Sequence, residues 1–207
     1  MNNIEKEQII KLIHREVIPA IGCTEPIALA LASAKAAEIL GQAPETIEVF
    51  LSANILKNAM GVGIPGTGMV GLPIAIALGA LIGKSAYGLE VLKDLTPEGL
   101  ERGKALVENR AISIHLKEQV DKLYIEVVCR AGNSRATAVI SHEHTRFVYL
   151  EKDGAVFMNS LANPGGEANG EEEEDLRLSF SMVYDFAMNM PLDEIRFIME
   201  TARLNEA

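Results

Sequence analysis

The sequence contains no tryptophan and only two cysteines, and its acidic residues outnumber its basic ones. Cys23 and Cys129 stand far apart in a chain of 207 residues, which excludes the dense disulfide framework of a small secreted domain. The 19 lysine and arginine residues against 29 aspartate and glutamate residues give a net charge of -10. Because clustered cations are needed to neutralise nucleic-acid phosphates or anionic lipids, we expect neither nucleic acid nor a membrane surface as a partner.

The sequence also shows no targeting or membrane-spanning pattern. Residues 1–15 carry acids among their apolar positions instead of the basic and then apolar segments of a secretory signal. The uncharged stretch between Lys57 and Lys84 is interrupted by glycines and Pro65, which leaves residues 72–82 as an apolar helix too short to cross a bilayer. We therefore expect a globular, cytoplasmic protein whose thiols stay reduced.

Hydrophobic periodicity predicts helices toward both ends of the chain and strands between them. Helical patterns cover residues 4–17, 24–41, 72–82, 96–108, 178–187 and 195–202. Strand patterns cover residues 46–51, 112–116, 123–129, 135–142 and 146–151. The order of these elements predicts an α+β fold with an antiparallel or mixed sheet.

The same patterns predict two lobes. We expect residues 44–160 to form an α+β lobe inserted into a helical lobe, which is built from residues 1–43 and 171–207. Residues 161–170, rich in glycine and poor in apolar side chains, are predicted to be the linker. An apolar stripe still runs at the end of the sequence, so we expect a truncated helical lobe that self-associates, most simply as a homodimer.

Cys23 lies in the segment Ile21-Gly22-Cys23-Thr24-Glu25-Pro26, directly before the small apolar residues of a predicted helix. Thr24 is the expected N-cap, and Pro26 is tolerated in the first turn because amides there have no acceptor within the helix. The partial positive charge at a helix N-terminus favours a thiolate, which would make Cys23 a nucleophile or a metal ligand. The alternative is a buried cysteine that acts as a small apolar residue.

Residues 52–68 form a glycine-rich segment between a predicted strand and a predicted helix. Backbone amides in such a loop can bind an anion, with Asn54, Lys57 and Asn58 as additional donors. A dinucleotide fingerprint is a weaker interpretation, because Pro65 occupies the turn and no acidic residue follows at the required distance. The structural alternative is that the glycines only permit close packing.

Two further groups carry less information. His142 and His144 would share one face of a strand as a possible metal pair, but no third ligand accompanies them, so we interpret them as a solvated strand end. Cys129 alternates with the apolar face of its strand and is predicted to be part of the core.

Together, the segments 22–30 and 54–67 resemble the two N-terminal signatures of the iron–sulfur L-cysteine desulfidases, which are related to the bacterial L-serine dehydratase α chain. Members of that family are roughly twice as long, so the resemblance covers an N-terminal half. It implies a [4Fe-4S] cluster held by three cysteines with one open iron, and Cys23 matches one of the three. The other two belong to the second half of the family's chain, and Cys129 matches neither, so this chain alone is not expected to hold a stable cluster.

The resemblance also implies a reaction. The open iron would activate the β-thiol of L-cysteine or the β-hydroxyl of L-serine as a leaving group, a base would remove the α-proton, and hydrolysis would give pyruvate and ammonia. Glu25 or Lys57 is the candidate base. The candidate residues for substrate binding are Asn54, Lys57, Asn58, Gly66 and Thr67.

Two alternatives remain open at this point. A pyridoxal phosphate enzyme could use a lysine before a glycine loop, although no other part of that architecture is visible in the sequence. A non-catalytic module that binds a small amino acid, or a regulatory module, would need only the loop.

Overall fold

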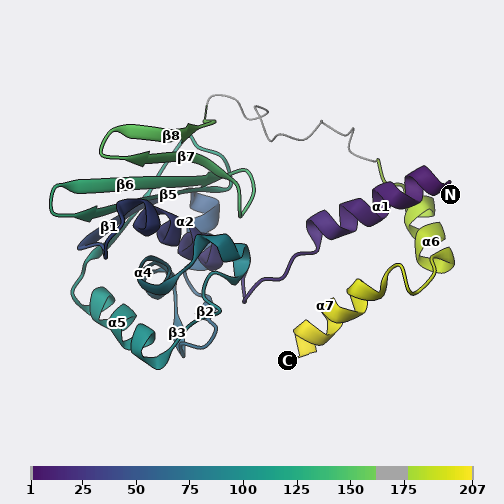
Figure 1. The fold of residues 1–207 in the computed structure, drawn as a ribbon, viewed down its shortest axis with the longest axis horizontal. Helices are drawn as coiled ribbons and strands as arrows, with labels where there is room; N and C mark the ends of the chain where they lie inside the picture. Colours follow the sequence, from purple (N-terminus) through teal and green to yellow (C-terminus); the bar gives the residue numbers. More distant parts are fainter. Residues whose placement is uncertain (1, 162–176, 207) are drawn as a thin grey trace. The chain divides into compact units, whose positions relative to one another are not determined.

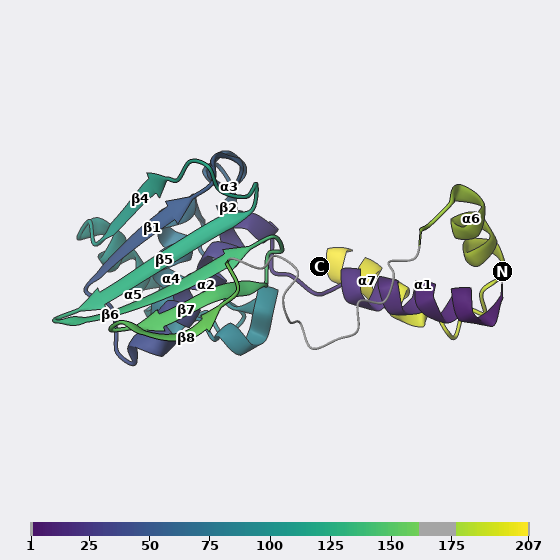
Figure 2. The same ribbon diagram turned by 90° about the horizontal axis from the view of Figure 1, so that it is seen from above.

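The computed structural model describes residues 2–161 and 177–206, and their contacts divide the chain into two units (Figure 1, Figure 2). The larger unit begins at Ala20 and contains the β-sheet. The smaller unit combines Met1–Pro19 with the C-terminal helices. The predicted linker, residues 161–170, and the acidic run that follows it fall almost entirely outside the described residues.

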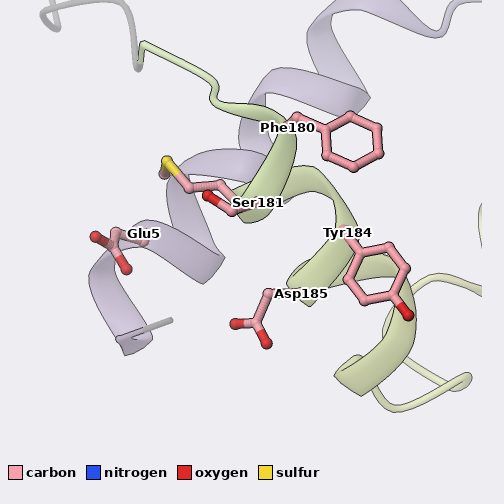
Figure 3. Close-up of a pocket in the computed structure, with 6 residues that line it drawn as sticks. Glu5, Phe180, Ser181, Tyr184 and Asp185 are labelled. Carbon is pink, nitrogen blue, oxygen red and sulfur yellow. The ribbon is translucent and has the colours of Figure 1, made fainter.

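The smaller unit consists of the helices α1 (Asn3–Glu16), α6 (Phe180–Asn189) and α7 (Arg196–Glu206). Its core contains the buried side chains of Ile9, Phe186 and Met190. A hollow of about 580 Å³ lies between Glu5 of α1 and the first residues of α6 (Figure 3). Among the residues that the structure describes, no helix combines the length and the apolar character needed to span a bilayer.

The larger unit is built on a six-stranded mixed sheet, which confirms the predicted α+β class. Its strands, in spatial order, are β4 (Ile112–Leu116), β1 (Thr46–Leu51), β5 (Tyr124–Ala131), β6 (Ser134–Ser141), β7 (Phe147–Lys152) and β8 (Ala155–Asn159). β1 and β4 are parallel, whereas every other neighbouring pair in this sheet is antiparallel. A parallel pair needs a crossover connection, which here runs from β1 through helices to β4.

Helices cover one face of this sheet. α2 (Thr24–Leu40) lies against β5 and β6, α4 (Leu72–Ile82) packs along α2, and α5 (Pro97–Glu108) packs against α4. Contact between α2 and α4 is very close, because a β-carbon at Gly79 would lie 2.2 Å from the carbonyl oxygen of Ala30. The short helix η1 (Ser85–Glu90) connects α4 to the segment that precedes α5.

The second helix occupies a different place from the one predicted for it. Sequence analysis assigned residues 1–43 to the helical lobe, but the larger unit begins at Ala20, and α2 lies at the centre of its core. The physical reason is that residues 26–34 of α2 are apolar on every side of the helix apart from Ser33, and all of them are buried. Such a helix needs cover on every side, which the sheet and α4 provide.

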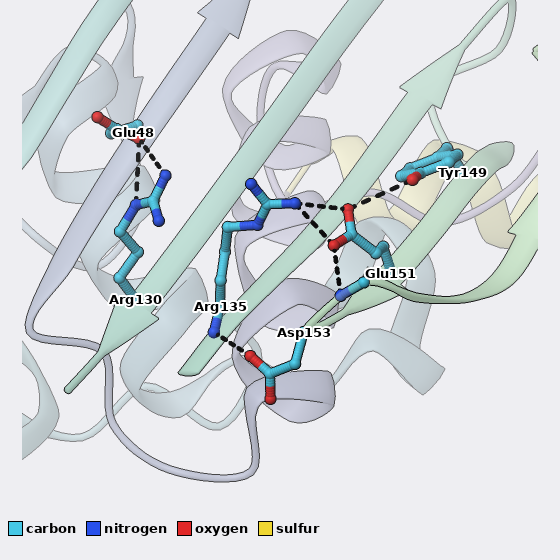
Figure 4. Close-up of polar contacts among 7 residues, drawn as sticks. Glu48, Arg130, Arg135, Tyr149, Glu151 and Asp153 are labelled. Carbon is cyan, nitrogen blue, oxygen red and sulfur yellow. Dashed lines mark hydrogen bonds and ion pairs between the residues drawn. The ribbon is translucent and has the colours of Figure 1, made fainter. Parts of the chain in front are cut away.

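The other face of the sheet carries polar side chains in a hydrogen-bonded network (Figure 4). Glu151 is only 5% exposed. Its carboxylate accepts two hydrogen bonds from Arg135, at 2.7 and 3.0 Å. It also accepts one from the Gly154 amide at 2.9 Å and one from the Tyr149 hydroxyl at 3.3 Å. Arg135 lowers the pKa of the Glu151 carboxyl and keeps it ionised. This carboxylate is therefore satisfied by the fold, and we assign it a structural role.

Candidate functional site

Cys23 lies at the N-terminal end of α2 and is exposed. It is itself the N-cap, with an extended backbone (φ -67°, ψ 134°), so the predicted cap at Thr24 is wrong by one residue. Its side chain makes no capping hydrogen bond. The sulfur atom is therefore available at the surface, which excludes the interpretation of Cys23 as a buried apolar residue.

Glu25 connects the two sequence segments that the resemblance rests on. The Cys23 thiol donates a hydrogen bond to Glu25 Oε2 at 3.0 Å, and the Asn58 amide Nδ2 donates to Glu25 Oε1 at 3.3 Å. Asn58 belongs to α3 (Ala53–Ala59), a short helix within the segment that we predicted to be a loop. The fold thus brings Cys23, Glu25 and Asn58 together in one cluster, which we call the α2-mouth cluster.

A second contact joins the same two segments. Gly22 has a φ of +83°, a backbone conformation that residues with a β-carbon rarely adopt. A β-carbon at this position would also lie 2.8 Å from Cγ of Pro65. Glycine is therefore required at position 22 both for its backbone angle and for the approach of Pro65.

The electrostatics of the α2-mouth cluster differ from the sequence-based prediction. Burial and the hydrogen bond to Glu25 raise the pKa of the Cys23 thiol above its ordinary value of 9.0. Backbone hydrogen bonds at the helix N-terminus act in the opposite direction, as expected, but have less effect. The predicted shift toward a thiolate is therefore wrong, because burial and the neighbouring carboxylate both favour the protonated thiol.

His144 is a member of this neighbourhood that sequence reasoning missed. The hydrogen bond from Cys23 lowers the pKa of the Glu25 carboxyl, and both Asn58 and the nearby His144 imidazole act in the same direction. His144 is half-buried in the turn between β6 and β7, and no local pattern could predict that this turn approaches α2. His142 does not share a strand face with it, because His142 has a φ of +71° and its Nδ1 lies 3.5 Å from Asp121.

Asn54 and Lys57, together with residues 116–122, border a groove of about 580 Å³ beside the start of α3, and Asn58 is not among its lining residues. Both side chains are exposed, and Lys57 makes no ion pair with any described residue. The groove is thus the place where Lys57 could meet a carboxylate.

The remaining two candidates lie in the turn of the β-hairpin formed by β2 (Gly63–Ile64) and β3 (Met69–Val70). The Thr67 hydroxyl donates to the Ile64 carbonyl at 2.6 Å and accepts from the Met69 amide at 2.9 Å, so it stabilises this turn. Gly66 has a φ of +76° and lines a separate hollow of about 420 Å³. Neither residue contributes to the α2-mouth cluster.

The described residues supply only part of a metal site. They contain no group of three or more histidine, cysteine, aspartate or glutamate side chains placed to hold a metal ion. Cys129 is buried in the sheet core, where burial raises its pKa to about 12, which confirms its predicted structural place. Any metal site that used the exposed Cys23 thiol would therefore need further ligands from outside these residues.

Comparison with known proteins gives relatives that extend beyond this chain. The chain is 70% identical over all 207 residues to a protein of Parabacteroides distasonis and 64% identical over 207 residues to one of Bacteroides fragilis, each named UPF0597 protein. It covers 48% of the length of each. A UPF0597 protein of Aeromonas hydrophila is 43% identical over 198 residues. The chain thus spans about half the length of the curated relatives it matches.

No protein-family model matches the chain, and no solved structure matches it either.

We expect the substitution Glu25→Gln to lower the pKa of Cys23, because it removes the carboxylate that stabilises the protonated thiol. The rate of alkylation by iodoacetamide at about pH 8 should then rise several-fold, since the thiolate is the reactive species. Glu98→Gln, on α5, makes the same change of charge elsewhere in the larger unit and serves as the control. An unchanged pH profile of alkylation in Glu25→Gln would contradict the assigned role of the carboxylate.

Proposed function

We propose that this chain is the N-terminal half of an iron–sulfur-dependent lyase that removes the β-substituent and the amino group of L-cysteine or L-serine. One observation supports this proposal above all others. The two segments that resemble the desulfidase signatures meet at an exposed cysteine, through the Glu25–Asn58 hydrogen bond and the Gly22–Pro65 contact. Both cysteines are free thiols, which agrees with a reducing cytoplasm as the place of action.

In this proposal Cys23 would hold one iron of a [4Fe-4S] cluster, and two cysteines in the rest of the polypeptide would complete its ligands. When bound, the cluster would supply a Lewis acid for the departing thiol or hydroxyl group. The chain itself must release the Cys23 proton before the sulfur can bind iron. The Cys23 thiol already donates a hydrogen bond to Glu25 Oε2, so this carboxylate is positioned to accept the proton. Asn58 orients the carboxylate by donating to its other oxygen, Oε1.

Glu25 and Lys57 are assigned different roles in the reaction. Hydrogen bonds hold the pKa of the Glu25 carboxyl below its ordinary value of 4.5, so it is ionised at neutral pH and able to accept the substrate α-proton. Lys57, exposed in the groove beside α3, offers an ammonium group to the substrate carboxylate. We therefore propose Glu25 as the base and Lys57, with Asn54, as the anchor.

The test uses a long form, which we define as the Parabacteroides distasonis relative with its matched 207 residues replaced by this chain. Purified without oxygen, it should be brown, contain iron and acid-labile sulfide, and form pyruvate from L-cysteine or L-serine. Detection of sulfide as a second product identifies cysteine as the substrate. A protein without iron, sulfide or colour would exclude the lyase and leave the non-catalytic amino-acid-binding module as the better explanation.

The substitution Lys57→Met in the long form should raise KM at least tenfold, because it removes the ammonium group and keeps most of the aliphatic stem. Steady-state kinetics measure this change. Lys122→Met, which alters another lysine of the same groove, should leave KM nearly unchanged. If Lys57→Met also leaves the kinetics unchanged, the groove does not bind the substrate carboxylate.

A further inference from the structure

Helix α6 of the smaller unit is apolar on two opposite faces. Phe186 and Met190 point toward α1 and are buried with Ile9. Phe180, Tyr184 and Met188 follow one another at intervals of four residues, which places them along one face of the helix. Tyr184 and Met188 each stand two positions from Phe186, roughly 200° around the helix axis, so this second set lies on a different side of α6 from the side chains buried with Ile9.

The described residues of the smaller unit leave the second face uncovered. Phe180 is 87% exposed, Tyr184 60% and Met188 65%. The rings of Phe180 and Tyr184 extend from the same side of α6 (Figure 3), with their centroids 6.5 Å apart and an interplanar angle of 22°. We call these three side chains the α6 outer stripe. A helix that is apolar on opposite faces is typical of a buried helix, which has neighbours on both sides.

The core formed by the described residues of the smaller unit is small. Their hydrophobic cluster contains three buried side chains, Ile9, Phe186 and Met190, supported by partly buried Ile10, Ile13 and Ile195. Domains of this size normally need a larger buried core, a metal or a partner to fold stably. The cover for the α6 outer stripe must therefore be present whenever the unit is folded, which favours a covalently linked segment over a transient partner.

The Parabacteroides distasonis protein is long enough to include such a segment, because this chain covers only 48% of its length. We propose that α6 is an interior helix of a larger helical domain, and that its outer stripe docks an apolar segment from the half of the long form that this chain lacks. Aromatic side chains with exposed rings are the usual anchors of such contacts. This proposal does not depend on the reaction that the protein catalyses.

The test replaces Phe180 and Tyr184 together by serine in the long form. We expect the midpoint of thermal unfolding to fall by about 3 °C or more, because two aromatic side chains lose buried contacts. The control exchanges two exposed apolar residues of the larger unit, Val70→Ser and Leu116→Ser, and should have no comparable effect. Hydrogen exchange of the unmodified proteins is the second measurement, and the amides of α6 should exchange more slowly in the long form than in the 207-residue chain.

Two results would overturn the proposal. If the serine variant keeps the unfolding midpoint and α6 exchanges equally fast in both forms, the stripe is exposed in the long form as well. If light scattering shows that the variant converts a dimeric long form into a monomer, the occupant is a second copy of the chain. An unchanged molar mass together with a lower unfolding midpoint supports the assigned occupant.

Discussion

Replacement of Cys23 by alanine in the long form is expected to abolish both iron binding and lyase activity while the fold stays intact. Cys23 is exposed at the start of α2, and its thiol is hydrogen-bonded to Glu25, so the loss of this side chain removes no core packing. A cluster ligand, in contrast, has no substitute once the thiol is gone. Iron content, absorbance of the brown protein and pyruvate formation measure the loss.

The second cysteine provides the matched control. Cys129 is fully buried against the helices, so Cys129→Ala should keep its iron and lose about 1 kcal/mol of stability through poorer packing. Cys23→Ala, in contrast, should lose its iron and keep the urea midpoint of unfolding unchanged. If Cys23→Ala retained its full iron content, Cys23 would not be a ligand, and the proposed function would lose its main support.

Gly79→Ala is expected to destabilise the larger unit by about 3 kcal/mol or more, the upper range for overpacking of a core. A β-carbon at Gly79 would lie 2.2 Å from the carbonyl oxygen and 2.7 Å from the Cα atom of Ala30. These are backbone atoms, so no side-chain rotation can relieve the clash, and α2 and α4 must move apart. The gain in helix propensity from glycine to alanine, about 1 kcal/mol, is too small to compensate.

Urea unfolding followed by circular dichroism measures this effect. Gly61→Ala is the control, because a β-carbon there would meet no atom within 4 Å and the residue has an ordinary backbone angle. Near-equal stability of Gly79→Ala and the parent protein would mean that the two helices are not as closely packed as the structure has them. Because α2 carries Cys23 at its start, a soluble Gly79→Ala variant should also bind less iron in the long form.

Most of the longer elements of the larger unit were predictable from the sequence. Gly41, with its φ of 80°, ends α2 at the predicted place. The alternating patterns of residues 123–129 and 135–142 form strands close to the predicted bounds. Both signals depend only on residues that are neighbours in the sequence. Cys129 was assigned to the core for the same reason. The helix α3 was missed, because its seven residues follow Ser52 without an apolar period long enough to detect.

The sequence by itself determined most of the helices and the longer strands, that Cys23 stands at the start of a helix, and that Cys129 belongs to the core. These features depend on periodicity, capping and turn residues, which act over a few neighbouring positions. Only the tertiary structure decided that α2 is the central helix of the sheet unit, that Asn58 binds Glu25, and that His144 approaches the same carboxylate. It also decided the direction of the Cys23 pKa, because burial and a carboxylate 3.0 Å from the sulfur outweigh the helix N-terminus. Each of these results comes from groups that the folded core brings together, and no local pattern encodes such contacts.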